Sequence, residues 1–224
     1  MTTIIGFSGK MGSGKDYTAT LVNEGLLSEH EHYTSFSMAF GNILRDEIEA
    51  ISSMYKTTES TIADLASHFS STENEMNNLI TLLTNDEGFY YDDYTIYKRT
   101  KKSREILQYW GTEVRRKQSL NYWIDRADEI LSKHDETFVF VTDVRFPNEY
   151  DLIKKWNGIM VRCEVSPELQ ALRLKTRDKK SANKDETVHS SETALDRHFF
   201  DIKVDTGLPK AADKIVTFIH KEAK

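Results

Sequence analysis

The sequence predicts an α/β fold in which a parallel five-stranded sheet is flanked by helices. Three short apolar runs, residues 3–7, 138–141 and 159–165, have the character of buried parallel strands. Turn or helix signals bound each run, which is the pattern of βαβ units rather than of a sandwich. Two weaker runs, residues 33–36 and 200–204, bring the expected strands to five.

The segments between the expected strands carry helix signals. Residues 16–27 follow the first strand, and Pro147 can open a helix that runs towards Trp156. Pro167, after Ser166, suits the first turn of another helix. We expect the last helix to start near residue 209.

The middle of the chain differs from both ends. Residues from about 47 to 100 contain no convincing strand, but they include helical pieces at 62–69 and 76–83. An acidic, tyrosine-rich loop follows at residues 89–94. We expect a helical insertion over one edge of the sheet, inside a single domain that spans residues 1–224.

Bulk properties narrow the class of protein. A chain of 224 residues is long enough for one α/β domain with a sizeable core. The formal net charge of −6 argues against a nucleic-acid polymer as the main partner. Cys163 is the only cysteine, which excludes an intramolecular disulfide, and its apolar surroundings predict a core residue. No apolar run approaches the ~20 residues that span a bilayer, so we expect a cytoplasmic protein without a membrane partner; a homodimer stays open.

Residues 9–16, Gly-Lys-Met-Gly-Ser-Gly-Lys-Asp, match a phosphate-binding loop (Walker A, or P-loop). The run lies between an apolar strand and a helix, the context that this motif requires. Glycines let backbone N–H groups turn towards phosphate oxygens, and Lys15 would reach the β- and γ-phosphates. Asp16 replaces the usual Ser or Thr, and its carboxylate can hold Mg²⁺ directly or through water. The residues that we expect to contact ATP in this segment are Gly9, Gly12, Ser13, Gly14, Lys15, Asp16 and Tyr17.

Other motifs distinguish a kinase from a motor or a switch. Asp143 follows the expected strand 138–141 and precedes Arg145, but the second carboxylate with which ATPase motors activate water is missing. The Asn-Lys-x-Asp motif of GTPases has only a near miss at residues 183–186. A phosphotransferase instead needs a basic lid that shields the transfer from water.

The basic stretch from about residue 173 to 190 fits such a lid. Arg173 and Arg177 are four residues apart, on one helical face, where they can clamp the moving phosphoryl group. Further arginines lie on segments expected near the carboxyl edge of the sheet, where α/β proteins bind ligands. These candidate anion clamps are Arg104, Arg115, Arg116 and Arg145.

Four segments, taken in order, resemble the deoxynucleoside monophosphate kinases of bacteriophages and bacteria. They are residues 9–16, residues 104–113 with Arg116 and Trp123, residues 142–149, and residues 189–192 followed by 201–205. The resemblance implies a P-loop kinase core of the adenylate-kinase-like kind, with ATP and Mg²⁺ as cofactors and phosphorylation of a dNMP to a dNDP. The insertion at 47–100 would be its NMP-binding part.

The same resemblance implies roles for individual residues. The catalytic residues would be Lys15, Asp143, Arg145, Arg173 and Arg177. The acceptor would contact Arg104, Gln108, Thr112, Arg116, Trp123, Asn148 and Glu149. The turn at residues 205–209, with Asp205 and Gly207, would lie against the adenine of ATP, although Asn is expected where this chain has Asp205.

Simpler interpretations stand beside these roles. Asn148 and Glu149 suit the first turn of a helix, where a carboxylate favours the helix dipole, and Trp110 and Trp123 suit a core. Two other functions remain open. One is a small-metabolite kinase resembling dephospho-coenzyme-A kinase, and the other is a non-catalytic nucleotide-binding module, favoured by Asp16.

Overall fold

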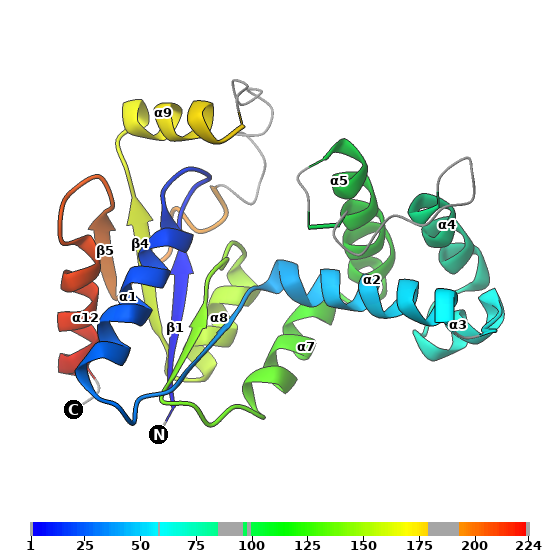
Figure 1. Ribbon diagram of the computed structural model, residues 1–224, viewed down its shortest axis with the longest axis horizontal. Coiled ribbons are helices and arrows are strands. Elements are labelled where there is room, and N and C mark those ends of the chain that lie inside the picture. The colour runs from blue at the N-terminus through cyan, green and yellow to red at the C-terminus, as the bar shows by residue number, and fades with distance from the viewer. Residues whose placement is uncertain (1, 58, 85–95, 98–99, 179–192, 223–224) are drawn as a thin grey trace. The chain divides into compact units, whose positions relative to one another are not determined.

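The computed structural model describes residues 2–57, 59–84, 96–97, 100–178 and 193–222 (Figure 1). It divides into two compact units. The first unit takes both ends of the chain, Met1–Phe40 and Asp128–Lys224, and the second is Gly41–Ala127.

The first unit contains the predicted five-stranded parallel sheet, in the order β2-β3-β1-β4-β5. Its strands are β1 Thr3–Ser8, β2 Ser35–Met38, β3 Phe138–Val141, β4 Ile159–Glu164 and β5 Ile202–Asp205. Ile5 of β1 is paired with Phe140 on one side and with Ile159 on the other. The fold class is confirmed, and the two weaker strands lie one or two residues later than predicted.

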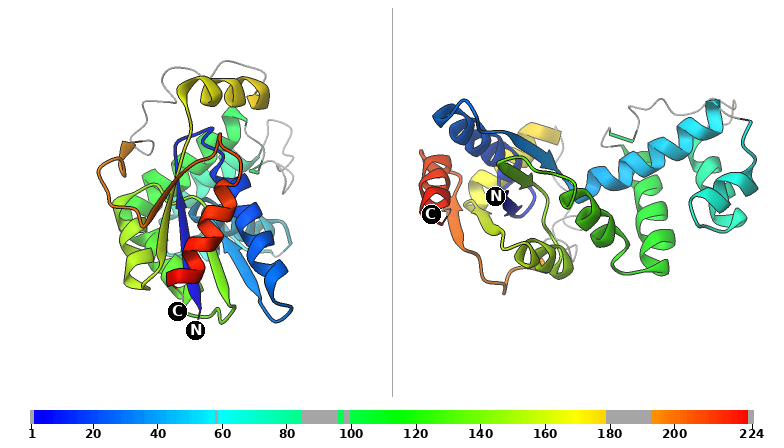
Figure 2. Two further views of the ribbon diagram at one scale, coloured as in Figure 1. Left: turned by 90° about the vertical axis from the view of Figure 1, so that its left-hand side faces the viewer. Right: turned by 90° about the horizontal axis from the view of Figure 1, so that it is seen from below.

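Helices lie against both faces of this sheet. They are α1 Lys15–Glu29, α8 Pro147–Lys155 and α12 Ala211–Glu222, whereas α9 Pro167–Asp178 lies across the carboxyl end of the sheet, beyond β4 (Figure 1). Helices α1 and α12 pack against each other over one face, where Phe7, Val22 and Ile215 belong to one buried apolar cluster (Figure 2). Gly6 faces the other way, and a Cβ there would come within 2.7 Å of Met160 Sδ and 3.1 Å of Ile153 Cγ1. Only glycine lets α8 approach β1 this closely.

The last helix starts later than predicted, at Ala211 rather than near residue 209. Leu208 N–H donates to the Asp205 carbonyl in a turn, and Lys210 has a left-handed φ of 65°. A residue in that conformation cannot belong to a right-handed helix, so the helix begins after it.

The strand order places the carboxyl end of β1 at a switch point. From β1 the chain passes to β2 on one side of the sheet, and from β4 it passes to β5 on the other side. In open α/β sheets, ligands bind outside the carboxyl ends of the strands at such a point. The loop that follows β1 is therefore where a ligand is expected.

The second unit is helical over its described residues. Its elements are α2 Phe40–Thr57, α3 Ile62–His68, α4 Glu73–Leu83, α5 Lys101–Gln108, the π-helix Tyr109–Arg115, α6 Arg116–Gln118 and α7 Tyr122–Leu131; α2 begins, and α7 ends, in the first unit. The helices predicted at 62–69 and 76–83 are present, and Thr61 and Thr72 cap them through hydrogen bonds with Asp64 and Glu75. The expected insertion, residues 47–100, falls inside this unit, whereas the tyrosine-rich loop 89–94 lies outside the described residues. No helix among those described is long and apolar enough to cross a membrane.

Candidate functional site

The loop between β1 and α1 has the backbone of a phosphate-binding loop. Gly12 and Gly14 have φ angles of 80° and 81°, in the left-handed region that glycine adopts at little cost. Ser13 N–H donates to the Lys10 carbonyl at 3.0 Å, which closes the turn. A Cβ at Gly9 would lie 2.7 Å from the Cys163 carbonyl oxygen, so this position also requires glycine. The loop delivers the chain into the N-terminus of α1, where the partial positive charge of the helix favours an anion.

Two charged side chains begin α1. Lys15 is 7% exposed, and its Nζ lies 3.9 Å from Asp16 Oδ1. The Asp16 side chain is 70% exposed, so its carboxylate is accessible to a cation. Mg²⁺ in nucleotide sites takes one or two carboxylates together with phosphate oxygens, and Asp16 fits that donor set. The described residues hold no cluster of three or more potential metal ligands.

Side chains from α9 and from the turn after β5 hold the phosphate loop from outside. Arg173 Nη1 donates to the Ser13 carbonyl at 3.2 Å and to Thr206 Oγ1 at 2.9 Å, while Nη2 donates to the Thr206 carbonyl at 2.9 Å. The Thr206 hydroxyl donates to the same Ser13 carbonyl, and Gln170 Nε2 donates to the Met11 carbonyl at 2.6 Å. These bonds direct loop carbonyls away from the helix terminus at which an anion would bind.

Arg173, Thr206 and Gln170 together form a brace that holds the phosphate loop. Two of these residues, Thr206 and Gln170, were not predicted from the sequence. Thr206 lies beside the predicted Asp205 and Gly207, and only that proximity in the sequence could have indicated it. Gln170 is three residues before Arg173, on the same face of α9. Arg173, predicted to belong to a lid, contacts the loop and Thr206 here, and its contact with a transferring phosphoryl group stays a prediction. The side chain of Arg177 and residues 179–192 of the expected lid lie outside the described residues.

The turn after β3 is tied to its surroundings through backbone and carboxylate groups. Asp143 Oδ1 accepts the Phe40 N–H at 2.7 Å, and Val144 N–H donates to the Phe7 carbonyl at the end of β1. Glu149 is 3% exposed, and its Oε2 accepts the Arg145 N–H at 2.7 Å.

The same Glu149 oxygen accepts the Phe146 N–H at 3.1 Å, and Asn148 Oδ1 accepts the Glu149 N–H at 3.1 Å. Glu149 and Asn148 therefore act in the first turn of α8, the simpler of the two interpretations. Their contact with an acceptor stays a prediction.

The turn after β5 is ordered by its own aspartate. Asp205 Oδ1 accepts the Gly207 N–H at 2.8 Å, and a Cβ at Gly207 would lie 3.0 Å from Leu169 Cδ2. Tyr17, on the first turn of α1, is 70% exposed. Contact of these residues with adenine stays a prediction.

Cys163 is buried, as predicted for a core residue. Its burial raises the pKa of the thiol to about 12.

The residues predicted on the acceptor side belong to the second unit. Arg104, Gln108 and Thr112 are exposed, while Arg116 is partly buried. A π-helix, Tyr109–Arg115, lies between Gln108 and Arg116, so positions four apart no longer share a face as they do in an α-helix. Trp123 is 4% exposed and donates its indole N–H to the Gly111 carbonyl, as a core residue does.

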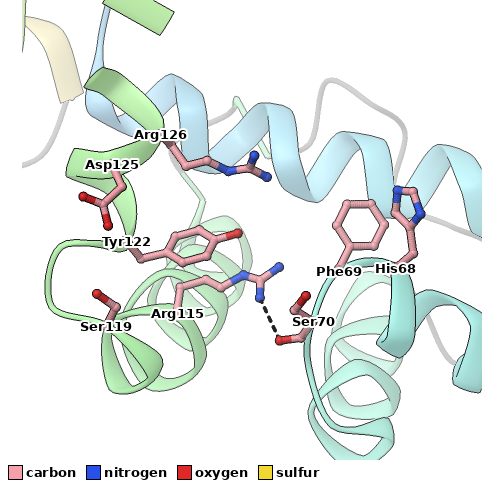
Figure 3. A pocket seen from close by; sticks show the side chains of 8 residues that line it. All are labelled: His68, Phe69, Ser70, Arg115, Ser119, Tyr122, Asp125 and Arg126. Atoms are coloured by element: carbon pink, nitrogen blue, oxygen red, sulfur yellow. Dashed lines mark hydrogen bonds between the residues drawn. The ribbon is translucent and has the colours of Figure 1, made fainter. Parts of the chain in front are cut away.

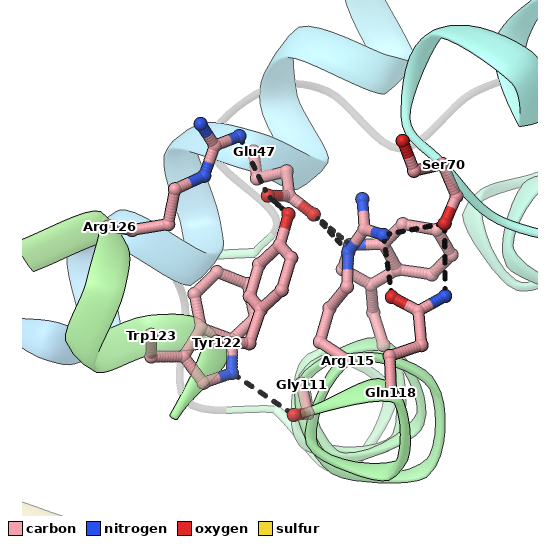
Figure 4. A network of polar contacts seen from close by, with 9 residues as sticks. Glu47, Ser70, Gly111, Arg115, Gln118, Tyr122, Trp123 and Arg126 are labelled. Carbon is pink, nitrogen blue, oxygen red and sulfur yellow. Dashed lines mark hydrogen bonds and ion pairs between the residues drawn. The ribbon is translucent and has the colours of Figure 1, made fainter. Parts of the chain in front are cut away.

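A buried ionic network, centred on Glu47 of α2, was also not predicted (Figure 4). One carboxylate oxygen of Glu47 accepts the Trp110 indole N–H at 2.8 Å and Arg115 Nε at 2.6 Å. The other accepts the Tyr122 hydroxyl at 2.7 Å and lies 3.5 Å from Arg126 Nη2. Arg115 is 1% exposed, so this predicted anion clamp is already neutralised by Glu47.

No protein-family model matches this chain, and no curated protein sequence matches it. Among solved structures, the protein TT1252 from Thermus thermophilus is 17% identical at a TM-score of 0.50, covering 100% of this chain and 98% of that one. The APS kinase of Mycobacterium tuberculosis, solved with AMPPNP and APS, is 13% identical at a TM-score of 0.47, with 98% of each chain covered. A shikimate kinase from Bacteroides thetaiotaomicron is 12% identical at a TM-score of 0.42, covering 99% of this chain and 98% of that one. Likeness at these identities concerns the fold alone.

Proposed function

We propose that this protein transfers the γ-phosphoryl group of ATP to a deoxynucleoside monophosphate, giving a dNDP and ADP. One observation carries the nucleotide part of the proposal. A glycine loop with two left-handed residues follows the central strand and leads into α1 at a buried lysine, Lys15. This combination of backbone donors, helix terminus and lysine is suited to a polyphosphate.

The chain's own groups have distinct tasks in this mechanism. The N-terminus of α1 and Lys15 hold the phosphates, and the brace formed by Arg173 and Thr206 keeps the loop in its curled form. Bound Mg²⁺ would neutralise charge on the phosphates, with Asp16 as its protein ligand. Arg145 supplies positive charge at the end of β3. An acceptor phosphate is already a nucleophile, so the protein needs to position it and exclude water, and no strong general base is required.

The choice of a deoxynucleotide as acceptor rests on the family resemblance. It is supported by the order of four motifs along the chain and by the predicted acceptor residues Arg104, Gln108 and Thr112. A guanidinium group, an amide and a hydroxyl can together bind the phosphate and the polar edge of a base.

The test is to measure ADP formation from ATP and Mg²⁺ with each dNMP, each NMP and dephospho-coenzyme A in turn. Turnover that requires a dNMP supports the proposal. Turnover only with dephospho-coenzyme A would keep phosphoryl transfer and replace the acceptor. ATP binding without turnover on any acceptor would contradict the proposal and indicate a non-catalytic nucleotide-binding module.

A further inference from the structure

The second unit contains a cavity of about 470 Å³, within the range of small-molecule sites (Figure 3). It lies between the end of α3 and the segment that joins the π-helix to α7. Its lining includes Phe69, Ser70, Arg115, Ser119, Tyr122 and Arg126. None of the residues predicted to bind the acceptor lines this cavity.

Arg115 places an unused hydrogen-bond donor in the cavity wall. Its Nε is bonded to Glu47, and its Nη1 donates to the Ser70 carbonyl at 3.4 Å and to Gln118 Oε1 at 3.1 Å. Among the described residues no acceptor is bonded to Nη2, which carries no dashed line in Figure 4. The Arg115 side chain is 1% exposed, but Nη2 itself is not a fully buried atom, so it borders the open space of the cavity. A ligand in the cavity can therefore offer an acceptor atom to Nη2 in a charge-assisted hydrogen bond.

The charges around Arg115 favour a neutral ligand over an anion. The Glu47 carboxylate, itself 5% exposed, lies 2.6 Å from Arg115 Nε and neutralises the buried guanidinium. Arg126 also lies near Glu47, and Asp125 adds a second carboxylate to the lining. The two cationic and two anionic groups balance, so the cavity supplies directional donors without a net positive charge.

The aromatic lining favours a planar ligand. The Arg115 guanidinium lies 4.6 Å from the centroid of the Tyr122 ring and 4.5 Å from that of Trp110, so aromatic groups fix its plane. The Arg126 guanidinium also lies over the Tyr122 ring, at 5.8 Å, so this ring is already covered by cations. Phe69 contributes a second ring to the lining, on the α3 side (Figure 3). Flat rings stack well on such side chains, as bases do on aromatic residues.

The wall opposite Arg115 is held in a strained conformation. Ser70 has a φ of 50°, in a position that usually belongs to glycine, and Ser71 N–H donates to the Ala66 carbonyl in the same turn. The turn directs the Ser70 carbonyl at Arg115 Nη1 and at Gln118 Nε2, which donates to it at 3.1 Å. Strain of this kind is common at ligand sites.

We propose that this cavity binds a nucleobase, stacked against Phe69, with a carbonyl or imino acceptor on Arg115 Nη2. The base can belong to the phosphoryl acceptor or to a second, regulatory nucleotide. If the base belongs to the phosphoryl acceptor, this inference rests on the proposed function. If it belongs to a second nucleotide, it does not, because that nucleotide can bind to a protein without kinase activity.

The experiment is calorimetric titration of the full chain, without ATP, with guanosine, adenosine, cytidine and thymidine. Nucleosides lack phosphate, so their binding reports on the base and sugar alone. Indole is the control ligand, since it can stack but offers no acceptor. We expect at least one nucleoside to bind at micromolar to millimolar concentration, and indole to bind at least about tenfold more weakly, which is about 1.4 kcal/mol.

Two variants test the location. Ser119 is exposed, and Ser119→Phe fills the cavity while leaving the Glu47 network intact; we expect it to weaken nucleoside binding by at least about tenfold. Ser132→Phe is the matched control, at an exposed serine outside the cavity, and should bind as the wild type does. Phe69→Leu removes the ring on which the base would stack and is the alternative should Ser119→Phe fail to fold.

Several outcomes separate this inference from the proposed function. If Ser119→Phe loses nucleoside binding and also has a raised KM for the acceptor, the base in the cavity belongs to the acceptor. The same loss with an unchanged KM identifies a second nucleotide, and nucleoside binding by a chain that shows no turnover would support the cavity while the proposed function fails. The absence of binding by any nucleoside, or equal binding by the wild type, Ser119→Phe and Phe69→Leu, would overturn the inference even if the kinase is active.

Discussion

Removing the Thr206 hydroxyl and the Arg173 guanidinium, separately and together, tests whether the turn after β5 holds the phosphate loop. Thr206→Val is nearly isosteric and removes a hydroxyl that donates to the Ser13 carbonyl and accepts from Arg173 Nη1 at 2.9 Å. Arg173→Ala removes that bond, a second one of 2.9 Å to the Thr206 carbonyl, and longer ones of 3.2 and 3.5 Å to Ser13 and Gly12.

The expected magnitudes follow from these contacts. A hydrogen bond from a charged group contributes about 1.5–3 kcal/mol, and a neutral one about 1 kcal/mol. We therefore expect Thr206→Val to lower the free energy of unfolding by about 1–2 kcal/mol, and Arg173→Ala by about 2–4 kcal/mol. Because both changes remove the bond that joins the two side chains, the double variant should fall short of the sum by about 1 kcal/mol.

Thermal unfolding without ligand and calorimetric titration with ATP are the two measurements. For a chain of this size, 1 kcal/mol corresponds to about 2–4 °C in Tm. Both variants should unfold at lower temperature and bind ATP about tenfold more weakly, since part of the binding energy must then order the loop. Thr176→Val is the control, because the exposed Thr176 hydroxyl donates only to the Leu172 carbonyl within α9.

The lid role predicted for Arg173 leads to a different result. A residue that contacts only the transferring phosphoryl group would lower kcat when removed, and it would leave the Tm of the ligand-free protein unchanged. In that case Thr206→Val would have no effect on ATP affinity. This pattern would refute the brace and return Arg173 to the lid.

Three further changes test the phosphate loop, the turn at Ser70 and the loss of stability at acid pH. Lys15→Ala should lower kcat/KM by on the order of 10²-fold or more, measured by ADP formation, because it removes a donor to the transferring group. Ser70→Gly should raise the free energy of unfolding by about 1 kcal/mol in denaturant titration, since glycine adopts a φ of 50° without strain. A hydrogen bond from Lys155 lowers the pKa of Asp128 below its ordinary value of 3.8. The ionised Asp128 therefore stabilises the folded protein above pH 3.8, and this stabilisation is lost as the pH falls through the lowered pKa. Asp128→Asn should therefore flatten the decline in Tm below about pH 4.

Each of these changes has a matched control in the chain. Lys10→Ala alters a lysine of the same loop whose side chain is 47% exposed and should keep most activity. Ser67→Gly, inside α3, should destabilise where Ser70→Gly stabilises. Asp213→Asn, at an exposed position of α12, should leave the decline in Tm at acid pH unchanged. Near-normal turnover of folded Lys15→Ala would contradict its role in phosphoryl transfer. A lower stability of Ser70→Gly would contradict the strain at Ser70. An unchanged decline in Tm at acid pH in Asp128→Asn would contradict the effect of Lys155 on Asp128.

The sheet could be predicted because its strands are buried on both faces. The run 138–141 is apolar throughout, and 159–165 is apolar except for Arg162 and Glu164; a buried parallel strand permits few polar residues. The edge strands were placed less well. β2 reads Ser-Phe-Ser-Met and β5 reads Ile-Lys-Val-Asp, and only Met38 and Val204 of these are buried. At the edge of a sheet fewer side chains must be apolar, so the pattern fixes the ends of the strand less sharply.

The phosphate loop was visible in the sequence because its requirements are local, whereas its brace was not. Glycines at 12 and 14 are needed for φ angles that other residues avoid, and they leave a motif in consecutive positions. The bond from Thr206 to the Ser13 carbonyl joins residues 193 positions apart. Nothing in either local sequence specifies that pairing, which arises because β1, β4 and β5 are neighbours in the sheet.

The second unit shows how burial changes the meaning of an arginine. By sequence alone, Arg104, Arg115 and Arg116 are equivalent candidates for binding a phosphate. Arg104 is exposed, whereas Arg115 is enclosed and already paired with Glu47, which comes from a helix 68 residues earlier in the chain. An exposed arginine is accessible to an anion, whereas a buried and neutralised one can offer only the direction of its remaining N–H bonds. Arg115 therefore suits a neutral, planar acceptor of hydrogen bonds, and Arg104 remains the better candidate for a phosphate.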